Sequence, residues 1–421
     1  MSPPRPRLKV VGRRLEPEDH RLRDFLTRIA QPHDFYEAGS PAADAVLAEA
    51  SAPCAELPVV IDEETVYSPA TVERLADAWR VHEGPSKSHY DLFIVGGGPA
   101  GLAAAVYGAS DGLSTAVAEE DVPGGQASHT ALIENFFGFV EGIGGAELAR
   151  LAGRQAERFG AELLILNGVV DSRLEVGKRP VAMLSNGARV SSEIALVACG
   201  MVWRRLKLEG IDELLGHGVY YGAGRSEAVQ CAGEDVMVVG AGNSAGQAVM
   251  NLATAGARVR MVVRGDRLSK SMSAYLVDRV EKHPSIDVRL RTRVTELHAA
   301  AGRLREVTVG TADGETERLA ISSLFLCIGG VPRTQWAAGS GVRTDDAGFI
   351  LTGPDLLENG RRPENWPLDR DPLALETSIP GLFAAGDVRH GSTKRVAGAV
   401  GEGAMAVTLA YRRLEELHQE A

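Results

Sequence analysis

The 421-residue chain has few cysteines, no long apolar run and no excess of basic residues. Its four cysteines are far apart, without a C-x-x-C pair or a metal-ligand spacing, so we expect reduced thiols in the cytoplasm. The absence of about 18 consecutive uncharged apolar residues argues against a membrane-spanning helix, and the first residues lack the apolar core of a secretory signal. A net charge of −11 disfavours nucleic acid and anionic membrane surfaces as partners.

Glycine, by contrast, is abundant. The 48 glycines suit tight strand-to-helix turns and are too many for a helical bundle. The length allows two or three domains, each with its own core. Hydrophobic residues make up 44% of the chain and charged residues 24%, as is typical of a globular enzyme.

The first 84 residues alternate between strand and helix patterns. Residues 8–11 and 57–61 predict strands, and residues 19–29 predict an amphipathic helix. A further helix is predicted over 68–79, with Ser68 as its N-cap and Pro69 at its first position. A polar linker follows at 85–89, so we expect residues 1–84 to form a small α/β domain.

A first nucleotide-binding pattern follows a buried strand at 90–95 and opens a helix over 99–110. The first glycine of such a pattern allows a tight turn, the second admits a pyrophosphate, and the third lets the helix pack on the strand. The helix N-terminus offers free N–H groups to the phosphates. A chance glycine cluster in a loop is the alternative, which the flanking strand and helix disfavour. The predicted contacts are Gly96, Gly98, Pro99, Ala100 and Gly101.

An acidic residue ends the next predicted strand. This strand covers residues 114–118, and Glu119 follows it directly. A carboxylate at this place can accept hydrogen bonds from ribose hydroxyls. Because Glu120 and Asp121 come next, a solvated acidic turn is the alternative.

A second pattern of the same kind follows a strand at 235–239 and comprises Gly240, Gly242, Asn243, Ser244 and Ala245. Its next strand, over 257–263, ends in Arg264 rather than in an acid. An arginine there suits a 2′-phosphate, which favours NADPH over NADH, and Arg267 and Lys270 could assist. A merely solvated basic face is the alternative. Two such patterns in one chain indicate a flavin together with a nicotinamide.

With these motifs the chain resembles the low-molecular-weight thioredoxin reductases, a family of pyridine nucleotide–disulfide oxidoreductases, over roughly residues 90–414. Further segments carry the resemblance: 124–126 and 134–135 are similar to flavin-contacting segments, 198–200 and 327–330 to interdomain strands, and 377–387 to a second FAD motif. The resemblance implies FAD contacts from Gly125, Gln126, Asn135, Gly386, Asp387, Arg395, Val396 and Ala397.

The same resemblance implies an α/β fold with two Rossmann-like domains. The FAD domain would be split into residues 90–206 and 327–421, with the NAD(P)H domain, residues 207–326, inserted between its halves. It also implies a homodimer and a rotation of one domain against the other during turnover.

One departure from the family bears directly on function. Family members that reduce thioredoxin carry a C-x-x-C pair just before the second nucleotide pattern, whereas residues 218–228 contain no cysteine. Dithiol exchange needs an attacking and a resolving thiol, and Cys231 alone cannot supply both. We expect Cys231 to be a structural or surface residue, and Cys199 and Cys327 to be small core residues. Only Arg264 of the expected phosphate-binding arginines is kept, because Gly265 follows it, so NADH remains open as the reductant.

The first 84 residues resemble a degenerate glutaredoxin or thioredoxin fold. Pro58 would take the cis-proline position before a strand, and the redox pair would fall near Leu15–Glu18, where no cysteine occurs. Cys54 lies close to Pro58, but a lone cysteine is more often inert. We therefore expect a docking or dimer element rather than an electron relay.

The predicted function is FAD-dependent NAD(P)H oxidoreduction, with hydride passing from NADPH to FAD and electrons then leaving to an unidentified acceptor. The acceptor classes left open are a partner redox protein, a quinone or other small oxidant, and an external disulfide, of which the last has least support. A flavin-based redox or nucleotide sensor with little turnover is the alternative from another class. A flavin monooxygenase fits the split FAD motifs less well.

No catalytic residue follows from the sequence. Tyr220 and Tyr221 are candidates to line the flavin face that a dithiol would occupy, or simply to fill space there. Glu227 falls near an acidic position of the family, but we expect a solvated carboxylate at a helix start. His129 and His390 lie near the flavin motifs, where a surface or hydrogen-bonded histidine is the more common role.

Overall fold

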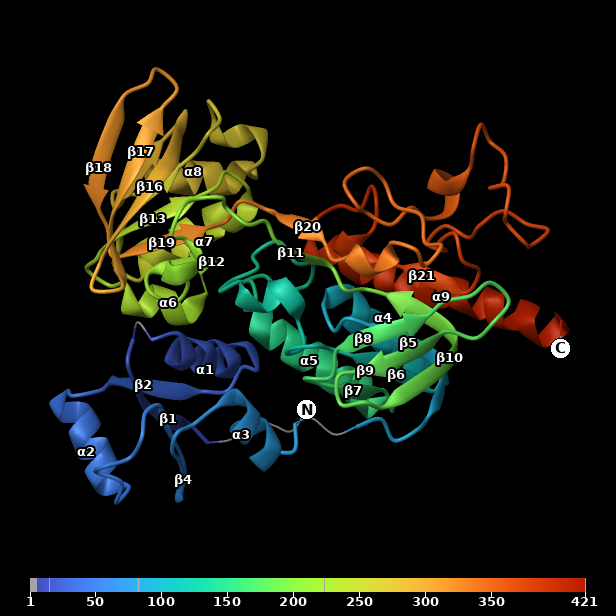
Figure 1. Cartoon of the computed structure of the whole chain (residues 1–421), viewed down its shortest axis with the longest axis horizontal. Helices are drawn as coiled ribbons and strands as arrows, with labels where there is room; N and C mark the ends of the chain where they lie inside the picture. Colours follow the sequence, from blue (N-terminus) through green and yellow to red (C-terminus); the bar gives the residue numbers. More distant parts are fainter. Residues whose placement is uncertain (1–5, 15, 82–83, 223, 421) are drawn as a thin grey trace.

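The computed structural model describes residues 6–14, 16–81, 84–222 and 224–420. Its elements form three packed units: an N-terminal unit and two nucleotide-type α/β units (Figure 1). The fold is therefore α/β, with two Rossmann-like sheets, as the glycine patterns predict. No helix of the described residues is both long enough and apolar enough to cross a bilayer.

The N-terminal unit is a four-stranded sheet with helices. The strand order is β2-β1-β3-β4, in which β1 is parallel to β2 and antiparallel to β3. The bond between Leu57 and Pro58 is cis, as the resemblance predicts. The elements are β1 (Leu8–Gly12), α1 (Pro17–Arg28), β2 (His33–Glu37), α2 (Pro41–Glu49), β3 (Val59–Asp62), β4 (Thr65–Tyr67) and α3 (Val72–Ala78).

The predicted start of the last helix of this unit is wrong. Helix α3 begins three residues after Pro69, and Thr71 is its N-cap, accepting a hydrogen bond from the backbone N–H of Arg74 at 3.2 Å. Ser68 instead donates to the carbonyl of Glu56 at 2.8 Å, so its hydroxyl does not cap the helix.

The first nucleotide unit (the first unit) is built on a seven-stranded sheet with the order β7-β6-β5-β10-β9-β8, and β21 pairs with β10. Strand β21 and helix α9 come from the end of the chain, so this unit is split in sequence (Figure 1). The predicted helix over 99–110 is confirmed. The elements are β5 (His89–Val95), α4 (Pro99–Ser110), β6 (Thr115–Ala118), α5 (Gly145–Arg158), β7 (Glu162–Leu164), β8 (Val169–Arg173), β9 (Val181–Leu184), β10 (Arg189–Val197), β21 (Leu382–Ala384) and α9 (Val396–Glu420).

The second nucleotide unit (the second unit) has a five-stranded parallel sheet with the order β12-β19-β13-β14-β15. A three-stranded antiparallel sheet, β16-β17-β18, packs beside it. The elements are β12 (Val219–Tyr221), α6 (Arg225–Gln230), β13 (Asp235–Val239), α7 (Asn243–Thr254), β14 (Arg258–Val262), α8 (Ala274–Lys282), β15 (Ile286–Arg289), β16 (Thr292–Ala300), β17 (Arg303–Thr311), β18 (Thr316–Ala320) and β19 (Ser323–Leu326).

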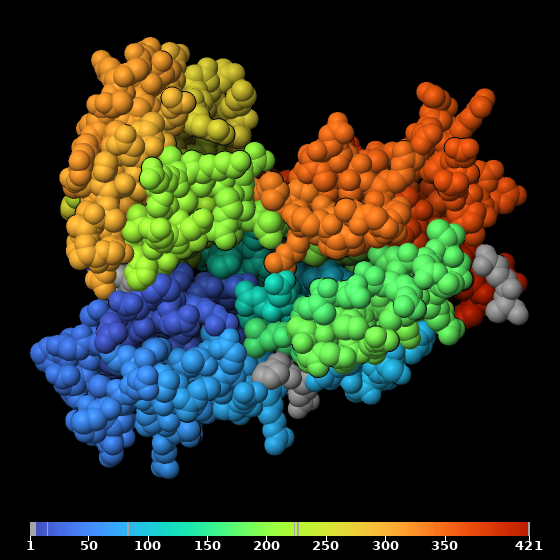
Figure 2. Space-filling view, in the orientation of Figure 1, coloured from blue at the N-terminus to red at the C-terminus, as the bar shows by residue number. Residues whose placement is uncertain are grey.

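The chain crosses between the two nucleotide units twice, near the expected boundaries at 207 and 327. The crossings are β11 (Met201–Trp203) and β20 (Gly330–Pro332), which pair with each other as an antiparallel ribbon. In the view of Figures 1 and 2, the N-terminal unit lies below the second unit and to the left of the first. Its helix α1 contacts α6 of the second unit and α5 of the first.

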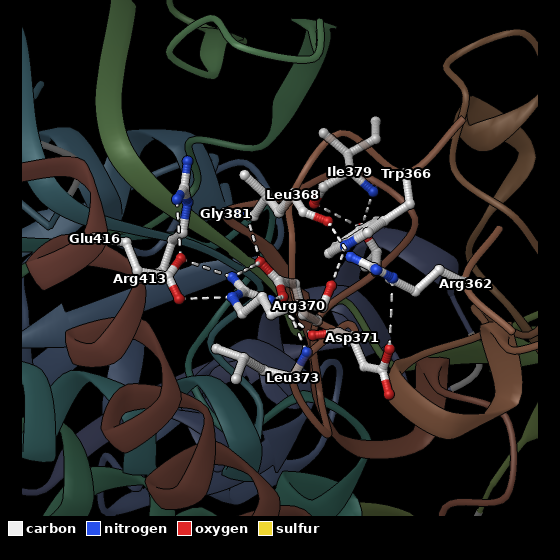
Figure 3. Close-up of polar contacts among 12 residues, drawn as sticks. Arg362, Trp366, Leu368, Arg370, Asp371, Leu373, Ile379, Gly381, Arg413 and Glu416 are labelled. Carbon is white, nitrogen blue, oxygen red and sulfur yellow. Dashed lines mark hydrogen bonds and ion pairs between the residues drawn. The ribbon is translucent and has the colours of Figure 1, made fainter. Parts of the chain in front are cut away.

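A long irregular segment lies between β20 and β21. A partly buried ion-pair network links it to α9: Arg370 binds Glu376 at 2.7 Å and Glu416 at 2.6 Å, and Arg413 also binds Glu416 (Figure 3). The side chain of Glu376 is fully buried.

Short 3-10 helices of the chain are η1 (Gly125–His129), η2 (Asp212–Leu214), η3 (Leu268–Lys270), η4 (Gln335–Ala337), η5 (Gly353–Leu356) and η6 (Gly386–Val388).

Candidate functional site

A cavity of about 2110 Å³ lies where the three units meet. Single small-molecule sites usually enclose roughly 300–1,000 Å³, so this cavity has room for more than one ligand. All three units contribute to its wall, including Asp24, Phe25 and Arg28 from helix α1 of the N-terminal unit.

The first glycine pattern forms a tight cradle at one wall of this cavity. Gly96 has φ of +107°, and a Cβ added there would lie 2.5 Å from the carbonyl oxygen of Ala198. A Cβ on Gly101 would lie 1.9 Å from the carbonyl oxygen of Gly96, so only glycine lets α4 pack this closely on β5. A Cβ added to Gly98 would not be crowded in this way. The predicted residues Gly96, Gly98, Pro99 and Ala100 line the cavity, and Gly101 lies behind them.

Glu119 lies beside this cradle and lines the same cavity. Its carboxylate accepts hydrogen bonds from the backbone N–H groups of Gly97, at 2.6 Å, and of Asp121, at 2.9 Å. Burial raises the pKa of Glu119 above its usual range, and the two N–H groups only partly offset this effect. Glu120, the next residue, is 60% exposed and fits the alternative of a solvated acidic turn. Glu119 does not fit it.

The segments expected to contact the flavin converge on the cradle. Gly125 lies against Gly98, and Gln126 donates from its side-chain amide to the carbonyl of Met201 at 2.6 Å. The cavity wall includes Gly125, Gln126, Asn135, Gly386, Asp387, Arg395 and Val396. Ala397, which follows Val396 in helix α9, is outside this wall.

Asp387 lies at the start of the η6 turn, next to the cradle. Burial raises the pKa of its carboxyl. Gly386 before it has φ of +79°, and a Cβ added there would lie 3.0 Å from the Cβ of Ala100. Residues from both chain segments of the first unit therefore meet at the cavity.

The second glycine pattern opens on the same cavity from the second unit. Gly240 has φ of +148°, and an added Cβ would lie 2.3 Å from the carbonyl oxygen of Cys327. Asn243 and Ser244, at the N-terminus of α7, line the cavity. Gly240, Gly242 and Ala245 shape the turn behind them, and the exposed Arg264 lies outside the wall.

The candidate tyrosines and histidines lie in different surroundings. Tyr221 lines the cavity, whereas Tyr220 is buried and stacks on Phe325 with ring centroids 5.4 Å apart. His129 lines the cavity, with Nδ1 lying 3.4 Å from a carboxylate oxygen of Asp24. His390 lies outside the wall and bonds to Asp345 at 2.6 Å.

The expectation for Glu227 is wrong. Its side chain is buried rather than solvated and bonds to Nε2 of His20 at 2.8 Å. Helix α1 covers α6 at this point and removes the carboxylate from water. The sequence gives no signal for this pair, because the two residues are 207 positions apart.

The four cysteines, all within the described part of the chain, are free. Cys327 is buried in the core as expected, and the burial of Cys231 favours the structural role over the surface one. The expectation for Cys199 is wrong, because this residue is half-buried at the cavity wall rather than in the core. Burial raises the pKa of each of these three thiols to about 12. They are therefore protonated and poorly nucleophilic near neutral pH. Cys54 is exposed on the N-terminal unit.

Comparisons with known proteins bear on the whole site. Residues 90–403 match the family described as pyridine nucleotide-disulphide oxidoreductase. The thioredoxin reductase of Bacillus subtilis is 31% identical over 333 residues, covering 78% of this chain and 96% of that protein. The mitochondrial thioredoxin reductase 1 of Arabidopsis thaliana is 30% identical over 375 residues, covering 84% and 92%. The crystal structure of Lactococcus lactis thioredoxin reductase superposes with a TM-score of 0.68 at 28% identity, covering 78% and 99%.

Proposed function

The chain belongs to the pyridine nucleotide-disulphide oxidoreductase family, and we propose that it is a thioredoxin reductase-like flavoenzyme whose electrons leave to an acceptor other than a dithiol of its own. FAD and NADPH are the cofactors of this family's thioredoxin reductases. The observation that carries the proposal is that the helices opened by two glycine turns, in different units, both present their N-terminal residues to one cavity: Pro99 and Ala100 of α4, and Asn243 and Ser244 of α7.

The residues of the first cradle fit FAD. The N-terminus of α4 presents unpaired N–H groups towards phosphates, and Gly98 leaves the backbone open to close approach. Glu119 would hold the adenosine ribose, and Asp387 would hold the ribityl chain. Gly125, Gln126, Asn135, Gly386, Arg395, Val396 and Ala397 would complete the contacts.

The residues of the second cradle fit a nicotinamide dinucleotide. Gly240, Gly242 and Ala245 bring the N-terminus of α7 to the cavity, where Asn243 and Ser244 would approach the pyrophosphate. Arg264 is exposed at the end of β14 and would bind a 2′-phosphate from outside the cavity wall. This placement supports NADPH, with NADH as the competing reductant.

The bound cofactors would supply the chemistry, which is hydride transfer from the nicotinamide to the flavin and electron transfer from there to an acceptor. The chain's own part would be to position both dinucleotides at the cavity. Its own thiols do not form a relay, since the three raised pKa values keep them protonated and residues 218–228 contain no cysteine. We propose a partner redox protein or a small oxidant such as a quinone as acceptor.

We propose that the N-terminal unit is a degenerate glutaredoxin-like domain. Its strand order β2-β1-β3-β4, with β1 parallel to β2 and antiparallel to β3, fits that fold. Of the segment where a redox pair would fall, Leu15 lies outside the described residues, and Glu16 and Pro17 face the second unit. A homodimer and a cytoplasmic location remain predictions; light scattering of the purified protein and fractionation of the source cells would test them.

Anaerobic stopped-flow mixing of the FAD-loaded protein with NADPH, and separately with NADH, tests the proposed function. We expect rapid bleaching of the flavin, faster with NADPH, and sustained turnover when a quinone or another artificial acceptor is added. Binding of NADPH without bleaching would instead indicate a sensor. Protein that stays colourless after incubation with FAD would refute the proposal.

A further inference from the structure

In the described part of the chain, the backbone passes between the two nucleotide units only at the short ribbon of β11 and β20. Three residues of each strand are paired, at Met201–Trp203 and Gly330–Pro332. Such a narrow connection acts as a hinge and does not by itself fix the orientation of the units. Direct contacts between the units are exposed: Arg279 binds Glu134 at 2.6 Å, and Arg395 donates to Ser273 at 3.3 Å, so each contributes modestly. Helix α1 of the N-terminal unit adds a further set of contacts, part of which is buried.

The first part of the contact between α1 and the second unit surrounds the helix start. Arg14 binds Glu234 at 2.7 Å and donates to the carbonyl of Gln230 at 2.7 Å. Glu16 lies 3.4 Å from Arg303 of the same unit. These pairs are partly exposed, so each contributes modestly.

The buried part of this contact is the pair of His20 and Glu227. Nε2 of His20 lies 2.8 Å from the carboxylate, and the imidazole packs on the ring of Tyr220 with centroids 5.0 Å apart. Glu227 is buried, so loss of its partner would leave a charge away from water.

One and two turns further along α1, the same helix face contacts the first unit. Asp24 lies 3.4 Å from Nδ1 of His129, and Arg28 binds Asp121 at 2.5 Å. Nε of Arg28 also donates to the hydroxyl of Ser128 at 2.9 Å. Residues 20, 24 and 28 are spaced by four and therefore form one stripe along the helix.

We propose that this stripe, His20, Asp24 and Arg28, is an interdomain clamp that holds the second unit in the orientation suited to flavin reduction. His20 and Glu227 are thus positioning residues, and the inference rests on the proposed function. A thiol pair in the second unit would have to face the flavin first and an external partner afterwards. Without such a pair, a single orientation of the second unit suffices for turnover. A clamp that fixes this orientation across the hinge would therefore not slow turnover.

The clamp depends on pH through the groups that face His20. These are Glu227 of α6, Asp24 and Arg23 of α1, and the ring of Tyr220 of β12. Burial alone would lower the pKa of His20, but the hydrogen bond and charge of Glu227 outweigh it and raise the pKa above 6.5. The clamp is therefore complete at and below the ordinary histidine value and weakens as pH rises through the higher pKa of His20.

The two acids stay ionised across this window. Burial raises the pKa of Glu227, yet His20 outweighs that effect and leaves the pKa below the usual range. The pKa of Asp24 is lowered to about 2, because His129 and Arg28 outweigh its burial. Within the pair of His20 and Glu227, it is therefore His20 that changes charge as the pH rises above neutrality.

Hydrogen exchange of the FAD-loaded protein tests the clamp without reference to activity. The variants are Glu227→Gln, which keeps the shape of the side chain, and Arg14→Ala, which removes a partly exposed contact and spares the buried pair. Arg7→Ala is the matched control, since its pair with Asp34 lies on the surface within the N-terminal unit. We expect amides of α6, β11 and β20 to exchange about tenfold faster or more in Glu227→Gln, about two- to fivefold faster in Arg14→Ala, and unchanged in the control. Wild-type exchange in both clamp variants would overturn the proposal.

Stopped-flow reduction of the flavin by NADPH, recorded across pH, supplies the second readout. In the wild type we expect the rate constant to fall above the pKa of His20, and in Glu227→Gln to be lower throughout and without that fall. Equal rates and equal pH profiles would overturn the positioning role. If NADPH fails to bleach even the wild-type flavin, the proposed function is refuted, and the exchange data alone decide the clamp.

Discussion

Gly98 offers a substitution whose effect separates ligand binding from folding. Its backbone is extended, with φ of −70° and ψ of −177°, which any residue adopts. Within the described chain, no heavy atom beyond its own neighbours lies within 4 Å of a Cβ added there. Gly98→Ala should therefore change the free energy of unfolding of the apoprotein by no more than about 0.5 kcal/mol.

The same methyl group lies where the backbone is proposed to approach the FAD pyrophosphate. Overpacking of a close contact costs about 1–3 kcal/mol, so we expect FAD to bind roughly ten- to a hundredfold more weakly. Fluorescence titration of the apoprotein with FAD measures the affinity, and denaturant unfolding of the same apoprotein measures stability. Unchanged FAD affinity in Gly98→Ala would refute the assignment of the first cradle.

Gly242 is the matched position in the second cradle. It too has extended backbone, with φ of −85° and ψ of 180°, and a Cβ there meets no described atom within 4 Å. Gly242→Ala should leave FAD affinity unchanged and weaken NADPH by a similar factor. If Gly242→Ala instead weakened FAD, the two cradles would not hold different dinucleotides.

Three further substitutions test other parts of the argument. Arg264→Ala should reduce the preference of kcat/KM for NADPH over NADH, and an unchanged ratio would contradict the proposed 2′-phosphate contact. Glu376→Gln leaves the half-buried Arg370 with one carboxylate fewer and should lower the free energy of unfolding by about 2 kcal/mol in denaturant titration; a neutral effect would show that Glu416 suffices. Replacing Cys199, Cys231 or Cys327 by alanine, one at a time, should leave turnover with an artificial acceptor at the wild-type level, whereas loss of turnover in a folded variant would identify a redox-active thiol.

The nucleotide cradles could be predicted from sequence because their determinants are local. A buried strand, a glycine turn and a helix start lie within about 20 residues, and steric exclusion by neighbouring backbone makes Gly96, Gly101 and Gly240 necessary. The start of α3 shows the limit of local rules. Ser68 and Pro69 form a plausible helix start, but the hydroxyl of Ser68 bonds to Glu56 and Thr71 caps the helix.

The burial of Glu227 could not be predicted for a different reason. A carboxylate in the first turn of a short helix is normally solvated, and only the packing of α1, more than 200 residues away in sequence, changes its surroundings. The stripe of His20, Asp24 and Arg28 has the same property. In the sequence alone this stripe is an ordinary charged helix face. Its role depends entirely on the residues of the other two units that it contacts.

The family match begins at residue 90, yet part of the cavity wall comes from before it. Asp24, Phe25 and Arg28 of α1 face the cavity beside Glu119 and His129. Because α1 occupies this side, a protein acceptor that approached the cavity here would collide with the N-terminal unit, while a small oxidant is limited only by the openings that remain. Acceptor size is therefore the property on which this part of the wall should act most. Comparing rates with small quinones and with bulky redox proteins, in wild type and in Arg14→Ala, measures that effect: if the wall matters, loosening it raises the rate with proteins more than with quinones.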